Sequence, residues 1–313
     1  MLYETNIFGL IGCDNNKEYK SNNVIIWDDL NSKILLKVTL ENKVLNLKLR
    51  KDAIFIVTEP KIFTLDLKTF QLIERIETGP NPLGLLGLNY IKEKTILVYP
   101  SNEENKKQGN ITIKSVDGKN INNGDITNNS NFLYISPHNH PVAYLALSNN
   151  GLLLATASEE GKKIRIFETQ TGGYLQELNR GKEKAKIKCI SIDFNNQFIA
   201  ASSERGTIHI WSLKESYEAM KKQGKVTLVD EGKQNMVSNV GSVFAIIPNF
   251  LGGKLFKKEW SFAQVRLDEP YSIFHFGTDN TLIILSNNGI YYKVKIDLEK
   301  GGDCTKLSES SLF

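Results

Sequence analysis

The residues best suited to chemistry lie in a short basic turn. The run Leu178–Gly181 is followed by lysines at every second position: Lys182, Lys184, Lys186 and Lys188. The guanidinium of Arg180, within this run, offers a planar fork of donors that suits the oxygens of a phosphate group. We therefore expect an anion site centred on Arg180. For an arbitrary basic segment, the alternative is a solvated turn with a charged edge.

Small polar and imidazole side chains occur on both sides of this turn. Hydroxyl and imidazole groups beside an arginine can donate hydrogen bonds to phosphate oxygens. The candidates before the turn are His138, Thr156, Ser158 and Arg165. The candidates after the turn are Ser203, Arg205, Thr207 and His209. Each also has a possible structural role, because Thr and Ser often hydrogen-bond neighbouring strands together and His209 can hydrogen-bond within its own sheet.

A long insertion, at about residues 214–258, combines lysines with an apolar run. Exposed apolar side chains are costly in water, whereas lysines suit acidic lipid headgroups. We interpret the insertion as a membrane-facing loop; the alternative is that it folds back on the protein as additional core. The residues expected to enter the membrane are Val243, Phe244, Ile246, Ile247, Phe250 and Leu251.

No group of residues in the sequence indicates an enzyme. The four histidines lack metal-ligand spacing, and no nucleophile motif or glycine-rich phosphate loop occurs. The cysteines Cys13, Cys189 and Cys304 are far apart, which argues against a disulfide framework and a zinc site. We therefore expect no catalytic residue, no metal and no cofactor, in a protein that resides in a reducing compartment.

The charge and hydropathy of the chain limit its partners. The formal net charge is +4, from 39 basic and 35 acidic residues, which is too small an excess to indicate nucleic acid. No stretch approaches the roughly 18 to 20 apolar residues of a membrane span, and the N-terminus does not resemble a signal peptide. We expect a cytoplasmic protein whose membrane contact is peripheral.

The elements that position the candidate residues are short strands recurring at a spacing of about 40 to 50 residues, except for the insertion before the last copy. Each copy is a β-branched or aromatic run followed by a polar residue. The copies are Val24–Asp28, Lys61–Asp66, Ile111–Asp117, Ile164–Glu168, Ile208–Ser212 and Tyr291–Asp297. Such a period is typical of propeller blades, which bury both faces only when stacked around an axis. A β-sandwich array would leave the period unexplained.

We therefore predict an all-β fold, a WD-repeat-type β-propeller that forms a single domain over residues 1–313, with about six recognisable blades. The clearest copies contain the predicted strands Leu152–Ser158 and Gln197–Ser203. The last copy shows only three convincing strands. Either Thr305–Phe313 supplies the closing strand of the ring, or the chain lacks an N-terminal blade.

Several segments share a pattern with one known family. They are Asn23–Leu30, Ile76–Leu85, Leu153–Ser158, Leu178–Gly181, Gly206–Ile210 and Glu259–Ala263. In this order they resemble the PROPPIN family, also called WIPI proteins, which are propellers that bind polyphosphoinositides. The family carries a Phe/Leu-Arg-Arg-Gly motif between two blades, and here the motif is Leu-Asn-Arg-Gly. The Trp-Asp-Asp-Leu and Asn-Pro-Leu-Gly segments look most like the smaller WIPI branch.

The resemblance implies a seven-bladed propeller with two phosphoinositide sites on its rim, each served by one motif arginine. Arg180 matches the second arginine, and the residues that follow it would complete that site. The group from His138 to Arg165 matches the other site. Asn179 stands in place of the first arginine, so that site should be weakened by about 1 to 3 kcal/mol through the loss of a charge-assisted contact. The insertion matches a long loop of the sixth blade that enters the bilayer, and family members begin with one more blade.

The function that the resemblance implies is that of a peripheral membrane adaptor. It would bind phosphatidylinositol 3-phosphate and/or the 3,5-bisphosphate and act in autophagy or endolysosomal membrane traffic. Its expected partners are phosphoinositide-containing membranes and autophagy or lipid-transfer proteins, and we expect a monomer on autophagosomal, endosomal or lysosomal membranes. The alternative is a WD-repeat scaffold for protein interactions that needs no lipid, which Asn179 slightly favours.

Overall fold

A computed structural model describes residues 5–90, 94–102, 109–117, 130–213, 258–267 and 272–311. Within these ranges every regular element is a β-strand, and the strands form six sheets. No helix of the described residues is long and apolar enough to cross a membrane. Most of the insertion, including the expected membrane-entering residues Val243, Phe244, Ile246, Ile247, Phe250 and Leu251, lies outside the described residues.

The sheets follow one another along the chain, and we name them blades A to F. Blade A consists of β1 (Ile7–Ile11), β2 (Asn23–Asp28) and β3 (Lys33–Thr39). Blade B consists of β4 (Asn46–Leu49), β5 (Ala53–Val57), β6 (Lys61–Asp66) and β7 (Leu72–Glu77). Blade C consists of β8 (Gly87–Leu88), β9 (Lys94–Pro100), β10 (Ile111–Asp117) and β11 (Ser130–Ile135).

The second half of the molecule carries the candidate site. Blade D consists of β12 (Val142–Leu147), β13 (Leu153–Ser158), β14 (Lys163–Glu168), β15 (Tyr174–Asn179) and, added last, β19 (Lys258–Glu259). Blade E consists of β16 (Ile187–Ile192), β17 (Phe198–Ser203), β18 (Thr207–Ser212), β20 (Ala263–Arg266) and β24 (Gly302–Asp303). Blade F consists of β21 (Ser272–Phe276), β22 (Thr281–Ser286), β23 (Ile290–Lys295) and β25 (Thr305–Ser311).

Small and apolar residues explain why the inner strands pack so closely. The sequences of β13 and β17 are LLATAS and FIAASS, and every residue of both strands is buried. Alanine and serine at these positions let two sheets approach face to face, while Leu and Ile fill the remaining space. The buried strands predicted at Leu152–Ser158 and Gln197–Ser203 are thus confirmed, each starting one residue later than expected.

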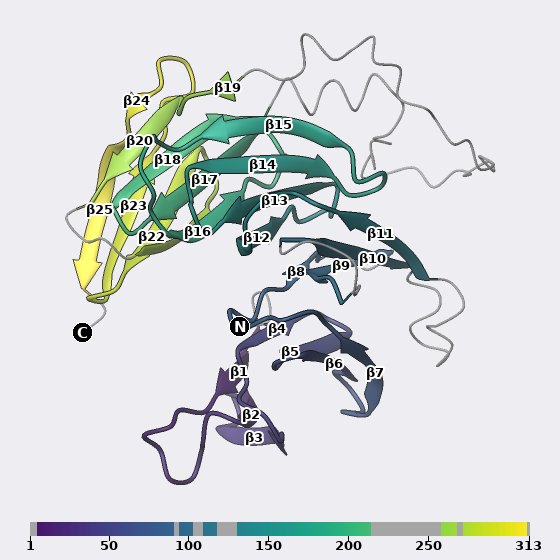
Figure 1. The fold of residues 1–313 in the computed structure, drawn as a ribbon. Helices are drawn as coiled ribbons and strands as arrows, with labels where there is room; N and C mark the ends of the chain where they lie inside the picture. Colours follow the sequence, from purple (N-terminus) through teal and green to yellow (C-terminus); the bar gives the residue numbers. More distant parts are fainter. Residues whose placement is uncertain are drawn as a thin grey trace, which may run out of the picture.

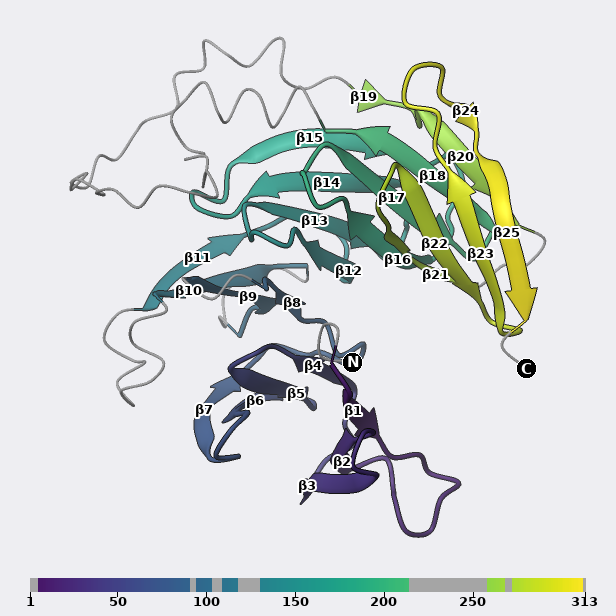
Figure 2. The same ribbon diagram turned by 180° about the vertical axis from the view of Figure 1, so that it is seen from behind.

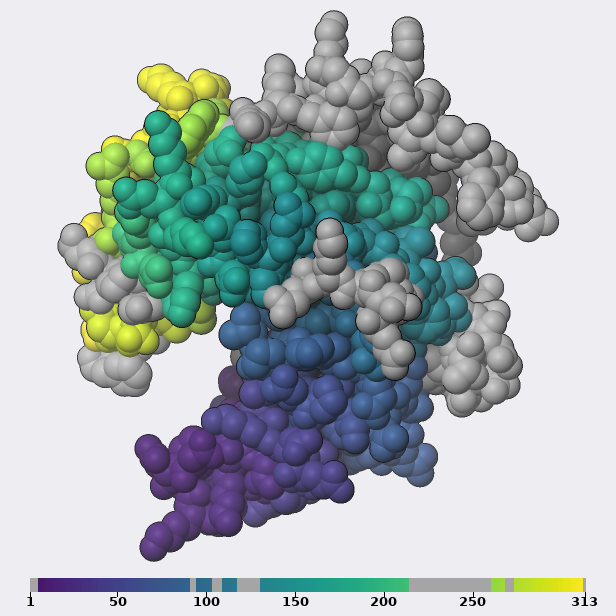
Figure 3. Space-filling view, in the orientation of Figure 1, coloured from purple at the N-terminus to yellow at the C-terminus, as the bar shows by residue number. Residues whose placement is uncertain are grey.

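One hydrophobic cluster lies between each pair of successive blades. Between blades D and E, Leu153 and Ile166 belong to the same cluster as Ile199 and Trp211. Comparable clusters join A to B, B to C, C to D and E to F. The blades therefore fan around a common centre in an arc, seen from opposite sides in Figures 1 and 2. Among the described residues no such cluster joins blade F to blade A, and blade A projects at one end of the arc (Figure 3).

The strand count of the terminal blades differs from the expectation. The last sheet has four strands, because Thr305–Ser311 forms β25 and pairs antiparallel with β23. Only three strands were recognisable in the sequence there, and the fourth comes from the C-terminal segment that was named as a possible strand; β25 is exposed along its length and carries no apolar alternation. The sheet with three strands is blade A. Thr305–Ser311 thus completes its own blade and does not bridge the arc.

Blades D and E each gain a short outer strand from a later part of the chain. β19 runs parallel to β15, and β24 runs parallel to β20. The bridging segment, which we define as residues 258–263, therefore passes from the outer edge of blade D to that of blade E (Figure 1). Gly301 lies against it, with a φ of +67° and no room for a Cβ, which would lie 2.4 Å from the carbonyl oxygen of Phe262.

Candidate anion-binding site

The connection from blade D to blade E is fixed by its backbone. β15 ends at Asn179, and the amide of Arg180 donates to the carbonyl of Lys162 at 2.9 Å. Further on, the amide of Ala185 donates to the carbonyl of Glu160 at 3.2 Å. The basic connection thus lies along the turn between β13 and β14, and this arrangement sets where its side chains emerge.

The side chain of Arg180 is part of this framework. It is 6% exposed, its Nε donates to the carbonyl of Gly161 at 2.5 Å, and its Nη2 donates to the carbonyl of Glu183. Burial, reinforced by the positive charge of Arg205, holds the pKa of Arg180 below its ordinary value. A guanidinium nevertheless stays charged in proteins. Arg180 therefore holds the connection in shape and places a fixed positive charge between blades D and E.

The predicted companions of Arg180 lie on one hairpin of blade E. Ser203 ends β17, and Thr207 and His209 lie on one face of β18 because they are two residues apart. The residues between and after them, Ile208 and Ile210, are fully buried. The Thr207 and His209 face is partly exposed, so it is this face that a ligand can reach.

Arg205 completes the hairpin and shares a partner with Arg180. It lies in the turn between β17 and β18, where its amide approaches Ser203 Oγ at 3.4 Å and its guanidinium contacts the carboxylate of Glu183. Glu183 therefore accepts from Arg180 through its carbonyl and from Arg205 through its carboxylate. An anion that binds Arg205 must replace this exposed carboxylate, and exposed ion pairs are weak.

His209 is neutral at neutral pH and is held by a residue from the bridging segment. Burial, together with the charges of Arg180 and Arg266, lowers its pKa. Its Nδ1 lies 3.1 Å from Ser261 Oγ. If Nδ1 accepts the hydroxyl proton of Ser261, the ring carries its own proton on Nε2 and can donate it to an anion.

Sequence reasoning did not assign Ser261 and Arg266 to the site. Ser261 was quoted only within the Glu259–Ala263 motif, without a role. Arg266 lies opposite Thr207 in the register of β18 and β20. The only signal that could have found both is the pairing of β20 with β18, and the insertion between these strands hides it from any local pattern.

The other predicted group gathers on blade D. His138 Nε2 lies 3.0 Å from Thr156 Oγ1, and both side chains are buried, as is Ser158. Arg165 donates through Nη1 to the carbonyl of Pro137 at 2.6 Å and through Nε to the carboxylate of Glu177 at 3.1 Å. The structure thus links His138, Thr156 and Arg165 in one network whose main charge is already paired, and it places Ser158 at the end of the strand that carries Thr156.

Electrostatics separate the two groups. Burial raises the pKa of Glu177, but Lys163 and Arg165 outweigh it and leave that pKa lowered, so this carboxylate is ionised and neutralises Arg165. Burial and the charge of Arg165 lower the pKa of His138 to about 4. Asn179 lies opposite Lys163 and adds no charge. We call Arg180, Ser203, Arg205, Thr207, His209 and Arg266 the blade E group, and His138, Thr156, Ser158 and Arg165 the blade D group. The blade E group combines three guanidinium groups with a neutral imidazole and is therefore better suited to an anion.

The lysines of the connection are at the surface. Lys184 contacts Glu160 at 3.0 Å, and Lys162 lies 4.0 Å from the same carboxylate. Lys184 contacts Glu160 through an exposed side chain, and such contacts exchange readily with solvent or with a ligand. The lysines therefore add a positive field around the site without a fixed geometry.

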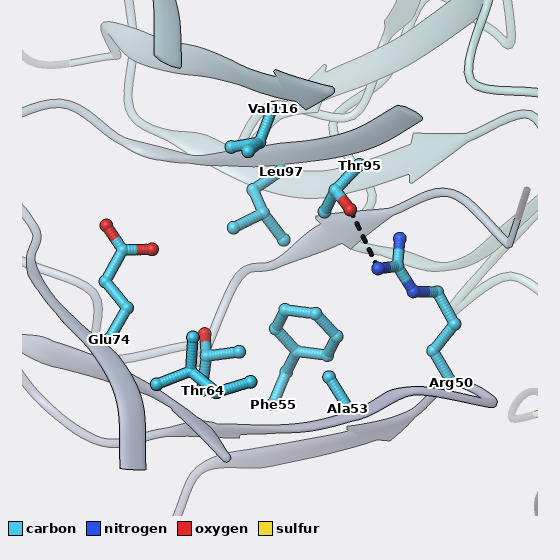
Figure 4. A pocket seen from close by; sticks show the side chains of 9 residues that line it. Arg50, Ala53, Phe55, Thr64, Glu74, Thr95, Leu97 and Val116 are labelled. Carbon is cyan, nitrogen blue, oxygen red and sulfur yellow. Dashed lines mark hydrogen bonds between the residues drawn. The ribbon is translucent and has the colours of Figure 1, made fainter. Parts of the chain in front are cut away.

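Neither the small cavity between blades B and C nor the acidic and sulfur side chains of the described residues provide a competing site, while a larger open hollow of about 420 Å³ on blade A is lined by apolar residues such as Leu10, Ile25 and Trp27. A cavity of about 20 Å³ lies between blades B and C, beside Arg50, which contacts Asp52 and Thr95 (Figure 4). Such a space holds about one water molecule and is far too small for a lipid headgroup. Across the described part of the chain, no cluster of three or more His, Cys, Asp or Glu side chains could hold a metal.

Comparison with known proteins assigns the family. Residues 24–313 match the PROPPIN family model. Autophagy-related protein 18e of Arabidopsis thaliana is 29% identical over 315 residues, covering 100% of this chain and 75% of that protein. Autophagy-related protein 18 of Schizosaccharomyces pombe is 27% identical, covering 98% of this chain and 85% of that protein.

Solved structures share the fold of this chain. Kluyveromyces lactis Hsv2 aligns with a TM-score of 0.74 at 18% identity, covering 100% of this chain and 86% of that one. KlAtg21, solved in complex with the coiled-coil of AgAtg16, aligns with a TM-score of 0.74 at 19% identity, covering 100% of this chain and 84% of that one. The predicted β-propeller fold and the family resemblance are both confirmed: the chain belongs to the PROPPIN family.

Proposed function

We propose that this protein is a peripheral membrane adaptor that binds phosphatidylinositol 3-phosphate and/or the 3,5-bisphosphate. It acts from the cytoplasm in autophagy or endolysosomal membrane traffic, and it is not an enzyme. Family membership and the autophagy-related relatives support this role. The observation that carries the proposal is the blade E group, in which buried Arg180 and exposed Arg205 share Glu183 as a partner and lie beside the polar face of Thr207 and His209.

The chemistry of this group suits a phosphomonoester on an inositol ring. Such a phosphate carries a charge near −2 at neutral pH and has three acceptor oxygens. Arg205 and Arg266 supply exposed charge, and Thr207 and His209 supply neutral donors beside it. Arg180 adds a buried positive charge that needs no rearrangement to act, which favours binding.

We assign the blade D group a smaller part. Asn179 replaces the first motif arginine, and Glu177 neutralises Arg165. His138, Thr156 and Ser158 are buried, and His138 and Thr156 are bonded to each other and, through Thr156, to the backbone, so they support the blade. One strong headgroup site per chain is therefore the expected stoichiometry.

The apolar run of the insertion would provide the membrane contact. We propose that Val243–Leu251 enters the interface while the neighbouring lysines meet acidic headgroups. The chain re-enters the described structure at β19, on the outer edge of blade D, close to the blade E group. This return point supports a loop that works beside the headgroup site.

Vesicle flotation tests the proposal. The purified chain is expected to float with vesicles that contain phosphatidylinositol 3-phosphate and to stay behind with phosphatidylcholine alone. Arg180→Ala should abolish flotation, but Arg180 also holds the connection, so Arg205→Ala is the cleaner variant because its side chain is exposed. If the folded wild-type chain fails to float with every phosphoinositide-containing vesicle, the lipid function is overturned.

Protein partners form the second part of the proposal. KlAtg21 was solved with a coiled-coil of AgAtg16, which supports autophagy proteins as partners of this chain too. We propose a monomer that brings autophagy or lipid-transfer proteins to the membrane. If flotation fails while such a partner still binds, the lipid-independent scaffold replaces the adaptor.

A further inference from the structure

The bridging segment holds its middle residues at a defined place on the outer edge of the molecule. On one side, Lys258 and Glu259 pair with Glu177 and Leu178 of blade D. On the other side, the amide of Phe262 donates to the carbonyl of Ile210 in blade E at 2.7 Å. Residues 260–262 therefore span two blades from fixed ends.

Further contacts within blade E also hold the segment. The carbonyl of Phe262 accepts from the amide of Gly302 at 3.0 Å, and its ring lies 6.4 Å from that of Phe198. Ser261 contacts His209 in the candidate site. The backbone of the bridging segment is therefore fixed on both sides. An exposed side chain on it has a defined position and does not belong to a loose chain end.

Trp260 is that side chain. It is 62% exposed, whereas Trp211 of the same blade is fully buried. Exposing an indole to water forgoes a large apolar burial, and tryptophan is the residue type enriched where an apolar phase meets water. It directly precedes Ser261, which places it beside the blade E group.

The surroundings of Trp260 select a membrane surface over an apolar protein groove. Arg205 and Arg266 are exposed on the same blade, and Lys163 is partly exposed on blade D. An exposed indole on the segment that joins two blades carrying exposed guanidinium and ammonium groups matches the layered chemistry of an anionic bilayer, where phosphates lie outside the acyl boundary.

We infer that Trp260 is a membrane-interface contact of the headgroup site. The indole lies at the boundary of headgroups and acyl chains while the blade E group holds the phosphate. This inference rests on the proposed lipid function and adds to it a residue outside the insertion. Because the bridging segment ties Trp260 to His209 through Ser261, headgroup binding and interface contact occur at a fixed spacing.

Phe194 provides a matched control. It is also an exposed aromatic residue of blade E, at 77%, but it lies in the turn between β16 and β17. The β16–β17 turn follows Ile192, whereas the β17–β18 turn, which carries Arg205, follows Ser203. Ile192 and Ser203 lie at opposite ends of the β16–β17 pair, so Phe194 is at the end away from Arg205. Phe194→Ala removes a comparable apolar surface away from the site.

Intrinsic fluorescence can report Trp260 without changing it. The chain has three tryptophans, so a Trp27→Phe variant retains only Trp260 and the buried Trp211. With vesicles containing phosphatidylinositol 3-phosphate, the emission of this variant should shift to the blue and be quenched by brominated acyl chains. An unchanged, unquenched emission from vesicle-bound protein would overturn the inference.

Binding measurements separate the inference from the proposed function. Trp260→Ala should weaken vesicle binding on the order of tenfold, keep binding of soluble inositol 1,3-bisphosphate, and be rescued by Trp260→Phe. Phe194→Ala should change neither. If Trp260→Ala binds vesicles as well as the wild type does, the inference about Trp260 is overturned while the proposed function stands. The same holds if Trp260→Ala loses as much affinity for soluble inositol 1,3-bisphosphate as for vesicles. A wild-type chain that binds neither ligand overturns the proposed function itself.

Discussion

His209 Nδ1 lies 3.1 Å from Ser261 Oγ, across the join between β18 and the segment that enters β20. These residues are separated by the whole insertion, yet they contact each other through Nδ1 of the imidazole. A neutral imidazole that accepts at Nδ1 presents a donor at Nε2. The candidate site is therefore completed by Ser261, a residue that follows the insertion in the sequence.

Removing the Ser261 hydroxyl should weaken headgroup binding while leaving the fold intact. Ser261→Ala is expected to lower the affinity for soluble inositol 1,3-bisphosphate about 2- to 10-fold, the range of one lost neutral hydrogen bond. Ser261→Thr keeps the hydroxyl and should restore most of the affinity. Calorimetric titration of the three proteins measures this. Equal affinities in all of them would mean that His209 takes no part in binding through this contact.

Removing the charge of the Glu183 carboxylate, which pairs with Arg205, should strengthen headgroup binding. Glu183→Gln is expected to tighten binding to vesicles with phosphatidylinositol 3-phosphate about 2- to 5-fold, because the exposed ion pair no longer competes with the phosphate. The carbonyl of Glu183 still accepts from Arg180, so the connection keeps its shape.

The control for this variant is Glu299→Gln, which changes the net charge equally in an exposed turn between β23 and β24. If both variants tighten binding to the same extent, general electrostatics explains the gain. In that case the contact between Arg205 and Glu183 would have no specific role.

Much of the fold near the site could be predicted from sequence because its signals are local. β13 and β17 have compact, small-residue sequences, and β14 and β18 alternate apolar and polar side chains. Hairpins of adjacent strands place Thr207 near Ser203 by turn geometry alone. The expected grouping of residues around the Leu178–Gly181 connection therefore agrees with the structure, while their ligand stays a prediction.

Other features could not be predicted, for physical reasons. β19 and β24 have two residues each and form only by pairing with strands already in place. β25 is exposed throughout, so it has no apolar period. The ion pair between Arg165 and Glu177 depends on the register between β14 and β15. A shift of one residue would turn the two side chains to opposite faces of the sheet. Such long-range pairings carry no local pattern.

The buried imidazole of His138 should make stability depend on pH. Burial and Arg165 lower its pKa from 6.5 to about 4, so at pH values between these two the unfolded chain binds a proton that the folded chain does not. Stability should therefore fall on acidification from about pH 6.5 to pH 4, by up to about 3 kcal/mol in total.

Thermal unfolding across this pH range, compared with His138→Gln, checks the expectation. The variant lacks the titrating ring, so its stability should change less on acidification than that of the wild type. Parallel pH profiles for the two proteins would contradict a buried, neutral His138.

Restoring the missing motif arginine tests whether the blade D group can bind a headgroup. Asn179→Arg places a guanidinium opposite Lys163, next to the network of Arg165 and Glu177. Soluble inositol 1,3-bisphosphate titrated into the wild type should show about one site, and the variant should gain a second, weaker one. The gain is expected because the added charge is not neutralised by Glu177, which already contacts Lys163 and Arg165. A variant that still binds one equivalent would mean that His138, Thr156 and Ser158 serve only to hold blade D together, and that the loss of the arginine removed no working site.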